Sequence, residues 1–63
     1  MFITSNGRFS IKYSGVMKYD IWYYGERVVH SEISFNDALR WLLAHNYIDS
    51  DQYEENRKKG FTI

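Results

Sequence analysis

Polar and apolar residues alternate along the first part of the chain, which predicts β-strands. Phe9, Ile11 and Tyr13 are separated by polar residues, and this period of two is typical of a strand with one buried face. Asn6-Gly7 lies just before this segment, and the dipeptide tolerates the positive φ angles of a type I′ turn. We therefore expect a hairpin that joins residues 2–5 to residues 8–13.

A second alternating segment covers residues 16–24, after a break at Ser14-Gly15. Its odd positions are apolar or aromatic, namely Met17, Tyr19, Ile21 and Tyr23. If these side chains face a core, Trp22 and Tyr24 face the other side of the sheet.

Gly25-Glu26 marks a turn into a further strand over residues 27–33. The register of that strand has two solutions, because shifting a strand by one residue exchanges its faces. A two-residue loop would bury Val28 and His30, whereas a three-residue loop would bury Val29, Ser31 and Ile33. We favour the three-residue loop, because it buries fewer polar groups.

The pattern then changes to the spacing of an amphipathic helix. One stripe consists of Phe35, Ala38, Leu39, Leu42 and Leu43, at the intervals of a helix that covers a sheet face. Ser34 is suited to cap the start of this helix, with Asp37 three residues later. Asn46 is the expected end.

A second, shorter helix is predicted from Asp49 to Gly60, with acidic residues early and basic residues late, as the helix dipole favours. Its apolar face is small. Only Tyr53, Phe61 and Ile63 are available to anchor it, so we expect it to be loosely held.

These elements predict one α+β domain spanning residues 1–63. It would be a small antiparallel β-meander of three to four strands, with one amphipathic helix packed on one face and a short C-terminal helix. The chain has 63 residues and no Cys, its start is too short and polar for a signal peptide, and no apolar run approaches the roughly 20 residues of a membrane span. We expect a cytoplasmic protein without a membrane anchor.

Charge and motifs argue against several classes of function. Eight basic residues balance eight acidic ones, so the basic excess of a phosphate-binding protein is missing. His30, Ser31 and Asp20 have the residue types of a catalytic triad, but neighbouring strand residues point to opposite faces. No phosphate-binding loop or plausible metal-ligand set is present. We expect no enzyme activity, no metal and no cofactor.

The chain is rich in aromatic residues, with two Trp, six Tyr and four Phe. Because Trp, Tyr and Arg dominate many protein interfaces, we expect a non-catalytic module that covers a surface of a larger partner protein. The expected contact residues are Trp22, Tyr24, Lys18, Arg27 and Trp41. In size and composition the chain resembles small bacteriophage proteins that inhibit host complexes. Alternatively, Tyr53, Phe61 or Ile63 covers Trp22.

Two other functions remain open. The segment Ile21-Trp22-Tyr23-Tyr24-Gly25-Glu26-Arg27, followed by a helix that opens Phe35-Asn36-Asp37-Ala38 and continues to Trp41-Leu42, resembles the arm-type DNA-binding domain of tyrosine recombinases. The resemblance implies that a three-stranded sheet enters the major groove of DNA. Independently of it, we expect one basic face with Arg8, Lys12, Lys18 and Arg27 and with interleaved Trp22 and Tyr24, which suits weak binding of single strands by stacking. The basic residues that follow the hairpin in that family are replaced here by Val28, Val29, His30, Ser31 and Glu32. A third possibility is a homodimer or self-assembling structural protein, in which a strand edge or the open sheet face pairs with a second copy.

Overall fold

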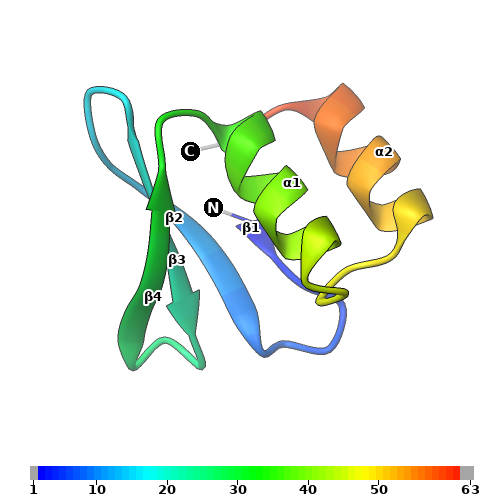
Figure 1. The fold of residues 1–63 in the computed structure, drawn as a ribbon, viewed down its shortest axis with the longest axis horizontal. Coiled ribbons are helices and arrows are strands. Elements are labelled where there is room, and N and C mark those ends of the chain that lie inside the picture. The colour runs from blue at the N-terminus through cyan, green and yellow to red at the C-terminus, as the bar shows by residue number, and fades with distance from the viewer. Residues whose placement is uncertain (1, 62–63) are drawn as a thin grey trace.

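The computed structural model describes residues 2–61, with side chains from residue 4 onwards. Four antiparallel strands form one sheet in the order β1-β2-β3-β4, and two helices lie on one side of it (Figure 1). The elements are β1 (Phe2–Ile3), β2 (Phe9–Gly15), β3 (Lys18–Tyr23), β4 (Arg27–Glu32), α1 (Phe35–Ala44) and α2 (Ser50–Lys59). The predicted α+β class with an antiparallel meander is confirmed.

The first hairpin is confirmed, but its turn is not the type I′ turn on Asn6-Gly7 that the sequence suggested. The Gly7 N–H donates to the carbonyl of Thr4 at 2.9 Å, so Ser5 and Asn6 occupy the centre of the turn and Gly7 follows with φ 74°. The buried Thr4 hydroxyl accepts from the Phe9 N–H at 3.1 Å and donates to the Asn6 side chain at 2.7 Å. These bonds fix the start of β2.

The tip of the β2–β3 hairpin is apolar and exposed, contrary to the sequence-based expectation for Met17. Gly15 pairs with Lys18, which leaves Val16 and Met17 as a two-residue turn. Val16 is 86% exposed, and Met17 is also exposed, with a positive φ of 57°. Met17 therefore lies outside the core, because the turn is completed before the alternation of β3 begins.

The β3–β4 loop has three residues, as predicted, but a β-bulge changes the register beyond it. Tyr24 and Gly25 have positive φ angles of 55° and 69°, and the Glu26 N–H donates to the Tyr23 carbonyl at 3.0 Å, which are the features of a type I′ turn. Trp22 pairs with Val28, whereas Ile21 pairs with His30, so one extra residue, Val29, is inserted into β4.

The bulge determines which residues of β4 face the helices. It places His30 and Glu32 opposite Ile21 and Tyr19, on the helix side, and Ser31 opposite Asp20, on the open side. The predicted burial of Val29, Ser31 and Ile33 is wrong, and all three are exposed.

Both helices begin at the predicted caps and α2 ends at the predicted Gly60, whereas α1 ends at Ala44, two residues before the expected Asn46. The Ser34 hydroxyl accepts from the Asp37 N–H at 3.1 Å, and the Asp49 carboxylate accepts from the Gln52 N–H at 2.7 Å. α1 ends before Asn46, which has φ 61°, and α2 ends at Gly60, which has φ 75°. These caps satisfy amide groups that the helix itself leaves without partners.

The core lies between the sheet and α1. It consists of Phe9, Ile11, Ile21, Phe35, Ala38, Leu39, Leu42 and Ile48. α2 has no buried residue, and its half-buried Tyr53 and the following Phe61 pack against this core. Phe61 contacts the rings of Tyr19 and Phe35, so it lies on the helix side and not over Trp22. Ile63, the third residue expected to anchor α2, lies outside the described residues.

Candidate binding groove

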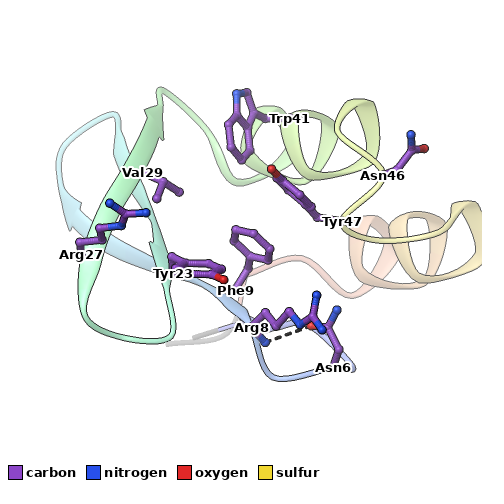
Figure 2. Close-up of a pocket in the computed structure, with 9 residues that line it drawn as sticks. All are labelled: Asn6, Arg8, Phe9, Tyr23, Arg27, Val29, Trp41, Asn46 and Tyr47. Atoms are coloured by element: carbon purple, nitrogen blue, oxygen red, sulfur yellow. Dashed lines mark hydrogen bonds between the residues drawn. The ribbon is translucent and has the colours of Figure 1, made fainter.

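A groove with an aromatic floor opens between the sheet and the end of α1 (Figure 2). Its volume is about 380 Å³. Four rings and Val29 form the apolar part, and two arginines and two asparagines provide polar groups. The lining residues are Asn6, Arg8, Phe9, Tyr23, Arg27, Val29, Trp41, Asn46 and Tyr47. We call this site the aromatic groove.

The way α1 ends places Tyr47 in the groove. The Tyr47 N–H donates to the Leu42 carbonyl at 2.9 Å, and the Asn46 N–H donates to the Leu43 carbonyl at 3.0 Å. This is the hydrogen-bond pattern of a Schellman motif, which turns the chain back against the helix. The Tyr47 ring consequently stacks on Phe9, with 4.3 Å between centroids and 23° between planes.

Trp41 closes the groove on the helix side and packs against β4, the edge strand of the sheet. Its indole stacks on the imidazole of His30 at 4.7 Å, with 9° between the planes. Its other ring neighbours are His45 at 4.3 Å and Tyr47 at 5.8 Å. The His30 Nε2 also contacts the Glu32 carboxylate, which fixes the imidazole against Trp41.

Two arginines flank the rings. The Arg27 guanidinium lies 5.7 Å from the centre of the Tyr23 ring, a cation–π distance. Arg8 follows the first turn, where its backbone N–H donates to Asn6 Oδ1 at 3.0 Å (Figure 2). The groove thus combines aromatic surface with positive charge, a combination that favours ligands with an apolar part and an acidic part.

The structure divides the predicted contact residues between two surfaces. Arg27 and Trp41 line the aromatic groove, while Lys18 and Trp22 belong to the opposite, open face of the sheet by the alternation of β3. Tyr24 lies in the β3–β4 turn and contacts the Tyr23 ring edge-on at 4.7 Å. The predicted contact residues therefore do not form one continuous surface.

The basic residues of the nucleic-acid hypothesis are divided in the same way. Arg8 lines the groove, whereas Lys12 lies on the open face with its Nζ 5.0 Å from the centre of the Trp22 ring. Trp22 is half-buried beside this ammonium group. The basic residues therefore lie on opposite faces of the sheet and do not form the one basic face that the hypothesis expects.

The open face also contains a buried carboxylate that the sequence did not indicate. The Ser31 hydroxyl donates to Asp20 at 2.5 Å. This hydrogen bond, together with smaller contributions from Ser14 and Lys18, lowers the pKa of Asp20 although burial acts in the opposite direction. Asp20 is therefore a stabilising anion at neutral pH.

Ser31→Ala should reduce stability in a pH-dependent way. A carboxyl group whose pKa is lower in the folded state contributes stability above its unfolded pKa, near 3.9, and loses it as the pH falls through the folded value. We expect the free energy of unfolding to fall by about 1–2 kcal/mol at pH 7. This loss becomes smaller below pH 4, because the protonated Asp20 carboxyl group accepts a weaker hydrogen bond than the carboxylate. Urea unfolding from pH 7 to pH 2 measures this difference, with Ser10→Ala as the control on the same face. An equal loss at every pH would contradict it.

The residue types of a triad do not meet. His30 faces α1 and contacts Trp41 and Glu32, whereas the Ser31 hydroxyl donates to Asp20 on the other face. Within residues 2–61, no three His, Cys, Asp or Glu side chains are grouped as metal ligands. In the same range, no helix has the length and apolar character that crossing a bilayer requires.

Sequence reasoning missed Tyr47 and the groove as a whole. The signal for Tyr47 was the Asn46 cap, because an apolar residue one position after a left-handed cap commonly packs back on the helix. Phe9 and Tyr23 were assigned to the core, and the groove exposes part of that core.

Comparison with other proteins gives no family: no family model matches the chain, and no significantly similar curated protein or solved structure was found. The function is therefore argued from the geometry of the aromatic groove and of the open face.

Proposed function

We propose that this chain is a non-catalytic protein-binding module, an inhibitor or adaptor that covers part of a partner's surface. The observation that supports this is the aromatic groove, where Tyr47, Trp41 and Tyr23 are accessible beside Arg8 and Arg27. Tyr, Trp and Arg are the residues that contribute most to protein interfaces, because they bury large areas and retain a polar group.

The aromatic groove is the primary contact surface in this proposal. Trp22 and Lys18 on the open face, with Tyr24 at the turn, form a second one. In the open face the Lys12 ammonium group already lies near the Trp22 ring, and Asp20 already accepts a hydrogen bond. A partner gains less there, since groups that have partners within the chain must first give them up.

Tyr47→Ala should weaken partner capture by at least about tenfold, the usual scale for an interface anchor. Tyr13→Ala is the matched control, because Tyr13 is 45% exposed and Tyr47 39%, and each packs on a neighbouring ring. The measurement is affinity capture from cell lysate, with and without nuclease, followed by a binding titration of the captured protein.

Each result of this capture experiment has a definite meaning. A protein that survives nuclease treatment, is lost with Tyr47→Ala and is retained by Tyr13→Ala supports the proposal. Loss with Trp22→Ala instead would transfer the contact to the open face. Material that disappears with nuclease would reject protein binding in favour of nucleic acid.

The nucleic-acid alternative rests on Lys12 and Lys18 beside Trp22, an arrangement suited to weak binding of single strands by stacking. That binding would weaken steeply with salt, because counterion release supplies most of its affinity. Self-assembly rests on the edge strand β4, and light scattering at two concentrations distinguishes a monomer from a dimer.

A further inference from the structure

The two arginines of the aromatic groove differ from the other two in the chain. Arg40 pairs with Asp37 at 3.5 Å and Arg57 with Glu54 at 2.9 Å, each within its own helix. Neither Arg8 nor Arg27 forms an ion pair with any described residue, and the lining of the groove contains no carboxylate. The groove therefore presents two guanidinium groups that have no ion-pair partner among the described residues.

The floor between these charges is aromatic. Phe9 and Tyr47 are stacked, Tyr23 lies 5.3 Å from Phe9, and Trp41 lies 5.8 Å from Tyr47. The volume of about 380 Å³ falls in the range of roughly 300–1,000 Å³ of ligand pockets. An aromatic or large aliphatic side chain placed there would contact several rings at once.

We propose that the aromatic groove binds an acidic peptide segment that carries an aromatic or large aliphatic residue. The apolar side chain occupies the floor, and neighbouring Asp or Glu carboxylates pair with Arg8 and Arg27. This inference rests on the proposed function, since it specifies which part of a partner protein is recognised.

The distribution of charge favours a peptide over a nucleic acid. A nucleic-acid strand carries a phosphate at every nucleotide and needs a continuous basic track. Here Lys12 and Lys18 lie on the face opposite to the groove, and the whole chain has a net charge of zero. Two guanidinium groups beside one apolar floor instead match a short segment with a few carboxylates.

The test is selection from a library of random peptides displayed on phage, with the immobilised wild-type protein as the target. Selected peptides should be enriched in Asp and Glu close to Trp, Tyr, Phe or Leu. The best of them is then synthesised and titrated against wild type, Arg8→Gln, Arg27→Gln and Arg40→Gln, with tryptophan fluorescence as the readout. Oligothymidylate is titrated in parallel.

We expect each groove substitution to weaken binding about tenfold, the scale of one lost hydrogen bond to a charged group. Arg40→Gln should leave the affinity unchanged, because Arg40 pairs with Asp37 and does not line the groove. Selected peptides that are neutral or basic, or equal effects of all three substitutions, would overturn the inference and leave protein binding standing. Binding of oligothymidylate with no peptide selected would overturn both, and no binding of either kind would overturn the inference.

Discussion

Ile21→Ala should remove a large part of the stability of this protein. Ile21 lies in the central strand β3, is 0% exposed and belongs to the core between the sheet and α1. Truncation of a buried isoleucine costs about 2–5 kcal/mol, because apolar contacts are lost and a cavity remains. A domain of this size has a total stability of only about 3–9 kcal/mol. Urea unfolding followed by circular dichroism measures the change.

Ile33→Ala is the matched control for this prediction, since it removes the same atoms from a side chain that is 61% exposed. We expect it to change the free energy of unfolding by less than about 0.5 kcal/mol. Equal losses in the two variants would show that the core does not lie between β3 and α1.

Trp41→Ala should destabilise the protein by about 2–3 kcal/mol, somewhat less than the loss of a fully buried tryptophan. Trp41 packs against the core and contacts the rings of His30, His45 and Tyr47. It therefore connects α1 to the edge strand β4. The shift of the urea midpoint gives the magnitude.

Trp22→Ala provides the comparison. Trp22 is also half-buried, but it does not pack against the core cluster. Its ring has a cation–π contact with the Lys12 ammonium group. We expect a loss of about 1 kcal/mol, the scale of an exposed cation–π contact with some burial. A larger loss for Trp22 than for Trp41 would reverse the assignment of the two tryptophans.

This difference also governs the choice of variants in binding experiments. A Trp41 variant that loses its partner has lost structure as well, so the loss cannot be assigned to the interface. Tyr47 lies at the chain reversal after α1, where its ring neighbours are Phe9, Trp41 and His45, and it does not belong to the partly buried residues packed against the core cluster. Its substitution therefore reports on the groove more directly.

The parts of the fold that depend on local sequence could be predicted. The caps at Ser34 and Asp49, the left-handed Asn46 after α1 and the three-residue loop before β4 each depend on residues within a few positions. Hydrogen bonds and φ preferences of this range are encoded in short segments.

The register of β4 could not be predicted, because the side-chain contacts formed in this register join β4 to residues far away in the sequence. The bulge at Val29 brings His30 to Trp41 and Ser31 to Asp20, and both partners lie on other elements. The register was chosen so that the fewest polar residues are buried, and this choice treats burial of His30 as unfavourable. In the structure its ring gains an indole and a carboxylate as neighbours.

Only a small part of the candidate site could be predicted from the sequence. Arg27 and Trp41 were expected to contact a partner, and both line the aromatic groove. Arg27 is separated from Trp22 because it pairs with Tyr23, whose side chain faces the helices, and Trp41 is separated because it lies on α1. Met17 shows the opposite error, since an apolar residue in the alternating pattern lies in an exposed turn.

The position of Met17 has a consequence for chemical damage. The chain has no cysteine and two methionines, and none of the core residues among those described contains sulfur. Oxidants convert an accessible methionine to its sulfoxide, which is polar and disrupts a packed interior. Met17 is exposed to solvent at the tip of the β2–β3 hairpin. Its oxidation therefore places a polar group on the surface and leaves the packing between the sheet and α1 intact.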